Sequence, residues 1–141
     1  MEITFQSEGV KQPQLDKEKL SKWIETVANE YSKEVGDVSF LFCNDNKILE
    51  VNKQFLNHNY YTDIITFDYS SGNIISGDIF ISIETVNSNS KLYKTSFMEE
   101  LHRVIIHGIL HLLGLNDLSA EDEKLMRIAE NQALQMLPYN V

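Results

Sequence analysis

Two histidines and one aspartate in the last third of the chain have the types and spacing of metal ligands. His107 and His111 are four residues apart in an apolar segment that predicts a helix over 97–114, so both imidazoles share one face and can reach one cation. Gly114 follows, and glycine adopts positive φ at little cost, so the chain can turn and bring Asp117 back toward the histidines. Two histidines and a carboxylate form a common catalytic zinc set with a fourth position open. We therefore expect one zinc ion per chain.

Other readings of the same residues stay open. Histidines four apart on a helix are common without a metal, but the positions around this pair are Gly, Ile and Leu, and burying two unpaired imidazoles costs free energy. A structural zinc site is usually rich in cysteine, and this chain has only Cys43. The zinc peptidase motif H-E-x-x-H carries its general base where this chain has Gly108, which disfavours a zinc metallopeptidase without excluding it. A non-haem iron oxygenase uses the same ligand types, usually on a β scaffold.

Further polar residues lie on the same predicted helix. Glu100 and Arg103 fall on the stripe of the two histidines and are candidate catalytic residues. Glu100 is interpreted as a general base, as a hydrogen-bond partner of a ligand, or as the partner of Arg103 in an exposed i, i+3 ion pair. His102 faces the opposite side, where we expect it at the surface.

The elements that must position these residues follow from hydrophobic periodicity and capping signals. Period-two and helical patterns predict a strand at Ile3 and Phe5, and then a helix from Asp16 past Tyr31 with Gly36 just beyond its end. A strand over 37–43 follows, and then a helix that is capped by Asp45 and has Phe55 facing inward. The rest of the chain predicts a hairpin of strands over 64–70 and 74–83, the helix over 97–114, and a last helix that begins at Ser119 and ends near Pro138. This order predicts an α+β fold, in which a small mixed sheet of about four strands packs against helices. We expect a single domain over residues 1–141.

Composition limits the function. The formal net charge is −9 and the sequence pI is about 4.8, which argues against general binding to nucleic acids or membrane surfaces. The start of the chain lacks a basic region followed by an apolar stretch, and no apolar segment is long enough to span a bilayer. One cysteine suits a reducing compartment, so we expect a cytoplasmic protein without a membrane partner.

Several segments together resemble the YbeY family of bacterial metal-dependent endoribonucleases. The family's H-G-x-L-H-L-x-G-Y-D-H is matched by HGILHLLGLND over 107–117, its T-D-V-L-S-F by TDIITF over 62–67, and its G-D-I-x-I-S by GDIFIS over 77–82. Glu100 matches a glutamate common in the family seven residues before the first histidine. The resemblance implies a zincin-like fold, bound zinc and cleavage of single-stranded RNA. It also implies a role in 16S ribosomal RNA 3′-end maturation and ribosome quality control, with ribosomal RNA and the ribosome or its proteins as partners. A non-catalytic ribosome-assembly factor with a structural metal is the alternative.

The chain departs from the family pattern at two places. The third family ligand is usually histidine, and Asp117 stands there. The family arginine before T-D-V-L-S-F is replaced by Leu56, so the expected cationic contact to phosphate is missing. His58 is a candidate catalytic residue that takes over part of this role, and Tyr60 and Tyr61 are candidates for stacking on unpaired bases or for local packing.

Overall fold

The fold is built on a four-stranded mixed sheet. The computed structural model describes residues 2–56 and 62–141, and within them the strand order is β1-β2-β4-β3. The elements are β1 (Ile3–Ser7), α1 (Lys17–Glu30), β2 (Glu34–Cys43), α2 (Asp45–Leu56), β3 (Ile64–Asp68), β4 (Ile74–Ser82), α3 (Ile83–Leu92), α4 (Phe97–Leu112) and α5 (Ala120–Leu134). β1, β2 and β4 run parallel, and β3 runs antiparallel to β4. This arrangement confirms the predicted α+β class, the mixed sheet and the hairpin.

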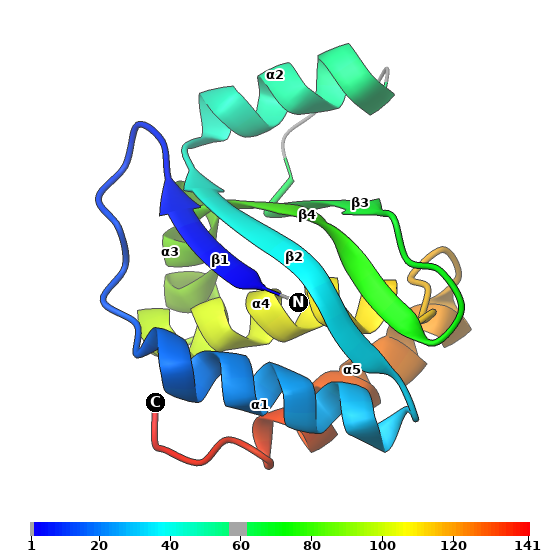
Figure 1. Ribbon diagram of the computed structural model, residues 1–141. Helices are drawn as coiled ribbons and strands as arrows, with labels where there is room; N and C mark the ends of the chain where they lie inside the picture. The colour runs from blue at the N-terminus through cyan, green and yellow to red at the C-terminus, as the bar shows by residue number, and fades with distance from the viewer. Residues whose placement is uncertain (1, 57–61) are drawn as a thin grey trace.

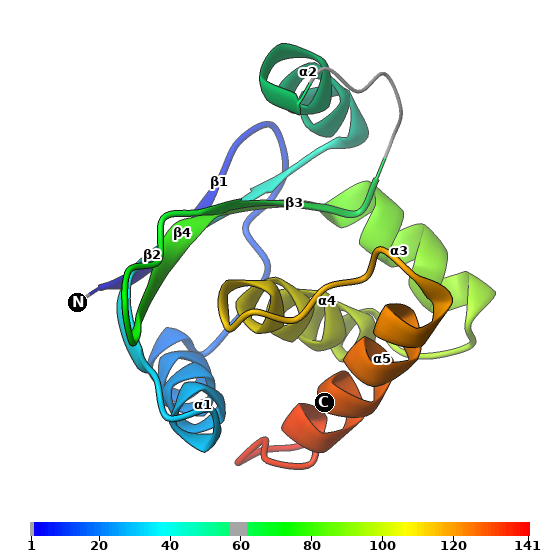
Figure 2. The same ribbon diagram turned by 90° about the vertical axis from the view of Figure 1, so that its right-hand side faces the viewer.

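The two faces of the sheet are covered unequally (Figures 1 and 2). α1, α4 and α5 lie on one side, with α3 beside α4, whereas α2 lies on the other side. Strand alternation produces this division, because successive side chains point to opposite faces. Phe40 and Ile79, which are partners in the β2–β4 register, belong to the main core on the α4 side. Cys43 and Ile65 form a smaller cluster with α2 on the other face.

Helix α4 is the buried element that carries the predicted metal ligands. Its start is fixed by Ser96, whose hydroxyl accepts a hydrogen bond from Glu99 N at 3.0 Å. Gly108 faces the sheet at very short range. A Cβ atom there would lie 3.0 Å from Ile64 Cδ1 and 3.1 Å from two carbons of Ile79. The absence of a side chain at this position therefore lets α4 lie directly against β3 and β4.

Four local predictions were wrong. Helix α3 was not predicted, because its sequence IETVNSNSKL is mostly polar and buries only Val86 and Ser90. α1 ends at Glu30, and Gly36 lies within β2, which begins at Glu34 rather than at 37. Asn44 rather than Asp45 caps α2, since Asn44 Oδ1 accepts from Lys47 N at 2.9 Å. Phe55 is 61% exposed instead of facing inward.

The prediction for His102 was also wrong, because this side chain is fully buried. Its Nδ1 donates to the carbonyl of Met98 at 2.6 Å, and its Nε2 accepts from the hydroxyl of Tyr139 at 2.8 Å. Its ring also contacts that of Trp23, with centroids 5.8 Å apart. The side of α4 opposite the metal ligands therefore faces α1 and the C-terminal segment rather than solvent.

Candidate metal centre

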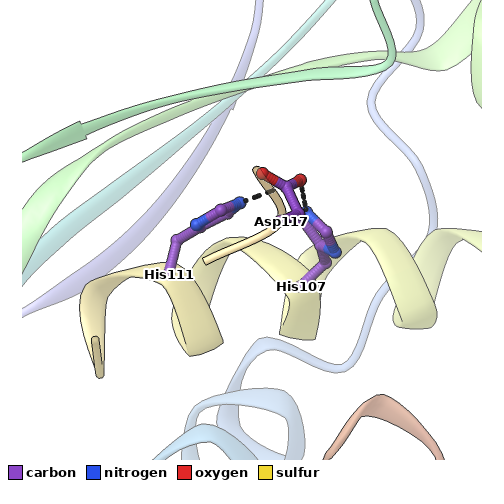
Figure 3. Close-up of side chains that lie close together, drawn as sticks. All are labelled: His107, His111 and Asp117. Carbon is purple, nitrogen blue, oxygen red and sulfur yellow. Dashed lines mark ion pairs between the residues drawn. The ribbon is translucent and has the colours of Figure 1, made fainter. Parts of the chain in front are cut away.

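The structure brings His107, His111 and Asp117 together at the C-terminal end of α4 (Figure 3). The two histidines are one helical turn apart and point to the same side of α4. After Leu112 the chain turns at Gly114, whose φ is 107°, and Leu115 N returns a hydrogen bond to Leu110 O at 3.0 Å. This helix end resembles the glycine-terminated ends found on many helices. The loop that follows places the Asp117 carboxylate opposite both imidazoles.

The distances within this cluster fit a shared ion. Asp117 Oδ2 lies 3.3 Å from His107 Nε2 and 3.4 Å from His111 Nε2, and the three donor atoms all lie within 4.8 Å of one another. Zinc bonds nitrogen and oxygen ligands at about 2.0–2.2 Å, so two ligand atoms of a tetrahedral site are about 3.3–3.5 Å apart. A direct charged hydrogen bond would be shorter, at about 2.7–2.9 Å. The two histidine–aspartate separations therefore match edges of a tetrahedral coordination site, and the third pair of donor atoms lies within 4.8 Å.

The hydrogen bonds behind the imidazoles also fit a metal. His107 Nδ1 donates to Glu130 Oε2 at 2.6 Å, and His111 Nδ1 donates to the Leu115 carbonyl at 3.0 Å. The Glu130 carboxylate and the Leu115 carbonyl can only accept a hydrogen bond, so Nδ1 of each ring must carry the proton. In a neutral imidazole the free lone pair is then on Nε2. Both lone pairs are thus on the atoms that face Asp117, as metal coordination requires.

Glu130, on α5, is a residue of the site that the sequence did not reveal. Burial alone would raise its pKa, but hydrogen bonds from His107 and Arg103 outweigh burial and hold the pKa below its ordinary value. Burial alone would lower the pKa of His107, but the hydrogen bond to Glu130 and the nearby carboxylates hold it above its ordinary value. Glu130 shares the buried side of α5 with Met126, Ala129 and Ala133, and this helical spacing is the one signal that could have pointed to it.

The candidate catalytic residues are found in different places. Arg103 Nη1 donates to Glu130 Oε1 at 3.0 Å, so the predicted exposed Glu100–Arg103 ion pair is replaced by a contact between α4 and α5. Glu100 is buried, and burial raises the pKa of its carboxyl group although Arg103 opposes this. His58 lies outside the described residues, as do Tyr60 and Tyr61.

A cleft of about 580 Å³ opens over the cluster of His107, His111 and Asp117, which we call the metal cluster. The side chains of both histidines and of Asp117 line it, together with residues from α2, β3 and the turn after α4. Asp63, which directly precedes β3, lines this cleft and also a smaller cavity beside His107 that contains Glu100. Burial raises the pKa of Asp63, and the nearby His107 opposes this. The TDIITF segment marked this region, but only the structure brings Asp63 next to the metal cluster.

Fold and site together define a metal-dependent hydrolase: an α+β sheet layer, a helix that offers two imidazoles, and a carboxylate from the following loop. The family model for endoribonuclease YbeY matches residues 3–138. The chain belongs to the endoribonuclease YbeY family.

Individual relatives agree with this assignment. The chain is 55% identical over 136 residues to endoribonuclease YbeY of Bacteroides fragilis, which covers 96% of this chain and 98% of the relative. It is 53% identical to that of Parabacteroides distasonis, with 98% and 97% covered. The solution structure of TM1509 from Thermotoga maritima superimposes with a TM-score of 0.67 at 26% identity, covering 96% of this chain and 89% of that one. Within residues 2–56 and 62–141, no helix is long and apolar enough to cross a membrane.

Proposed function

We propose that this chain is a zinc-dependent endoribonuclease that cleaves single-stranded RNA during 16S ribosomal RNA 3′-end maturation and ribosome quality control. The observation that carries the proposal is the His107–His111–Asp117 cluster on the floor of an open cleft, in a chain of the endoribonuclease YbeY family. The family favours RNA cleavage over the metallopeptidase, iron oxygenase and assembly-factor alternatives.

The three proposed ligands are His107, His111 and Asp117, which would hold one zinc ion. When bound there, zinc supplies Lewis acidity toward a phosphate oxygen and lowers the pKa of water. The chain's own contribution is orientation, because each imidazole is fixed by a hydrogen bond at Nδ1 and presents Nε2 to the cleft. The cleft volume of about 580 Å³ lies within the range of ordinary ligand sites.

Asp63 is the carboxyl group best placed to accept a proton in the cleft. It lines the cleft together with both histidines, and burial raises the pKa of its carboxyl group toward the range of a useful base. Glu100 does not line this cleft but lines the smaller cavity beside His107, together with Arg103, Arg127 and Glu130. We therefore assign proton transfer to Asp63 in preference to Glu100.

The acidic character of the chain bears on its partners and location. A net charge of −9 opposes tight, unaided binding to a polyanion, so recognition of ribosomal RNA is proposed to depend on the ribosome or ribosomal proteins. We place the protein in the cytoplasm, where these partners are, and treat residues 1–141 as a single catalytic domain, in keeping with the family match over residues 3–138.

The test is to measure zinc content and RNA cleavage side by side for the wild type and the His107→Ala and Asp117→Ala variants. The wild type should contain one equivalent of zinc and cleave single-stranded RNA faster than duplex RNA, and a chelator should abolish cleavage. Both variants should lose zinc and activity while keeping their circular dichroism spectrum. Analysis of product ends distinguishes attack by water from attack by the ribose 2′-hydroxyl, since the latter leaves a cyclic phosphate.

Two results would refute the proposal. Cleavage that persists in the chelator, or in folded His107→Ala protein, would exclude the metal mechanism. Hydrolysis of unfolded protein without RNA cleavage in the same preparation would favour the peptidase.

A further inference from the structure

Glu130 is the point where α5 meets the metal cluster. Its side chain is only 8% exposed, and both of its carboxylate oxygens are engaged. Oε2 accepts from His107 Nδ1 at 2.6 Å, and Oε1 accepts from Arg103 Nη1 at 3.0 Å. Arg127 Nη1 lies 3.5 Å from the same Oε1. The two arginines of the chain, Arg103 and Arg127, therefore both meet at this one carboxylate.

These contacts connect three residues in series. Arg103 and His107 lie one turn apart on α4, and Glu130 reaches them from α5. The Arg103 guanidinium holds one oxygen of Glu130, which leaves the other oxygen aimed at His107 Nδ1. That hydrogen bond sets both the tautomer and the orientation of the imidazole. Because both oxygens already pair with neighbouring side chains and the carboxylate is only 8% exposed, Glu130 is poorly accessible to a substrate.

We propose that Glu130 and Arg103 are positioning residues that set the affinity of the metal centre by fixing the His107 ring, and that Arg103 does not contact RNA. The inference rests on the proposed metal site. It changes the role expected for Arg103, which the sequence suggested as a catalytic residue.

The sign of the Arg103 effect separates positioning from simple electrostatics. Removal of a positive charge beside a dication site should strengthen metal binding by Coulomb's law alone. Positioning predicts the reverse, because an unsupported Glu130 no longer orients His107. Arg127 provides the matched control. Its contact with Glu130 Oε1 is longer than that of Arg103, at 3.5 Å against 3.0 Å, and its side chain is 56% exposed whereas that of Arg103 is 19% exposed.

The experiment measures zinc dissociation constants by chelator competition, without RNA, for the wild type, Glu130→Gln, Arg103→Gln, Arg103→Lys, the Glu130→Gln/Arg103→Gln double variant and Arg127→Gln. Glu130→Gln should weaken zinc binding about 10- to 100-fold, as is typical when the partner of a ligating histidine is removed. Arg103→Gln should also weaken it, Arg103→Lys should restore part of the loss, and Arg127→Gln should leave binding unchanged or slightly tighter. The double variant should bind no more weakly than Glu130→Gln, because the two residues act in series.

A second readout follows the imidazole directly. Nitrogen NMR of the metal-free chain should show His107 as the Nδ1-protonated tautomer in the wild type and a mixture in Glu130→Gln. If Glu130→Gln fails to fold, Glu130→Asp takes its place, because it keeps the charge but shortens the reach to His107. A substitution that only destabilised the fold would lower the unfolding midpoint, but the folded protein would still show the wild-type tautomer of His107.

Several outcomes would overturn the inference. Unchanged zinc affinity in folded Glu130→Gln or Arg103→Gln protein would do so, and so would tighter binding in Arg103→Gln. Normal zinc affinity with reduced RNA cleavage in Arg103→Gln would instead make Arg103 a substrate contact. A wild type that binds zinc but does not cleave RNA would refute the proposed function while leaving this inference intact.

Discussion

At the scale of single residues, protons would compete with the proposed metal for His107. Its pKa is held above the ordinary histidine value, because Glu130 and the nearby carboxylates outweigh the effect of burial. A proton on Nε2 must leave before a metal can bind, so metal affinity depends on pH. The stronger this imidazole holds its proton, the higher the pH at which competition begins.

We therefore expect zinc affinity to begin falling at a pH above about 6.5, the unperturbed histidine value, and to keep falling as the pH decreases. For each proton that must leave before zinc binds, the zinc affinity falls by up to about tenfold for each unit by which the pH decreases. Chelator competition at a series of pH values between about 6 and 8 measures this. An affinity that stays constant down to about pH 6 would contradict the raised pKa of His107.

The half-buried Asp63 lines the open cleft, whereas the buried Glu100 does not. Asp63→Asn should lower the rate of RNA cleavage by about 100-fold or more, because a positioned proton acceptor contributes at least that much. Glu100→Gln is the matched control and should have a smaller effect, since Glu100 lines the smaller cavity beside His107 and not the cleft. The measurement is kcat with zinc content checked in each sample. Equal losses in the two variants, or none in Asp63→Asn, would remove Asp63 from the mechanism.

At the scale of elements, the end of α4 decides where Asp117, the third proposed ligand, lies. Gly114 has a φ of 107°, and a Cβ atom there would meet nothing within 4 Å. A side chain at position 114 would therefore meet no steric clash, and its cost in free energy would come only from backbone strain at positive φ, at about 1–3 kcal/mol. If the backbone relaxes to avoid this cost, the loop that carries Asp117 shifts.

Gly114→Ala should lower both the free energy of unfolding, by about 1–3 kcal/mol, and the affinity for zinc. Gly72→Ala is a control from the β3–β4 hairpin, where φ is 61° and there is also open space. It should lower stability without changing zinc affinity. Urea unfolding and chelator competition give the two quantities, and equal zinc affinity in both variants would show that the Gly114 turn does not set the Asp117 position.

The sequence predicted elements well where periodicity and capping agreed. The helix with the two histidines, the helix starts at Asp16 and Ser119, and the β3–β4 hairpin were all predicted near their observed bounds. Helix α3 was missed because its sequence is mostly polar and it buries little apolar surface. His102 and Glu130 were misjudged or missed for a common reason. Their environments come from other elements, and a helical wheel describes each helix alone.

At the scale of the whole molecule, His102 connects α4 with α1 and the C-terminal segment. Burial lowers the pKa of this imidazole, although the hydrogen bond to the Met98 carbonyl opposes the shift. The unfolded chain therefore takes up a proton at a pH at which the native chain does not. Stability from this group is complete above the unfolded-state pKa of about 6.5 and decreases as the pH falls below it.

The wild type should lose up to about 1.4 kcal/mol of stability per pH unit from His102 between its unfolded and native pKa values. A His102→Gln variant lacks this proton uptake, so the difference in stability between the two proteins should shrink as the pH falls below about 6.5. Urea unfolding at several pH values measures the difference, in which contributions from the other histidines cancel. A difference that is independent of pH would show that His102 titrates alike in both states.

The close approach of α4 to the sheet has a consequence for the kinds of catalyst this scaffold can become. Peptidases of the H-E-x-x-H type carry their base at the position of Gly108. Here even a methyl group would lie 3.0 Å from Ile64 Cδ1 and 3.1 Å from two carbons of Ile79, so these side chains must shift before a glutamate could enter. This close packing therefore opposes the shortest mutational route from this nuclease scaffold to proteolysis.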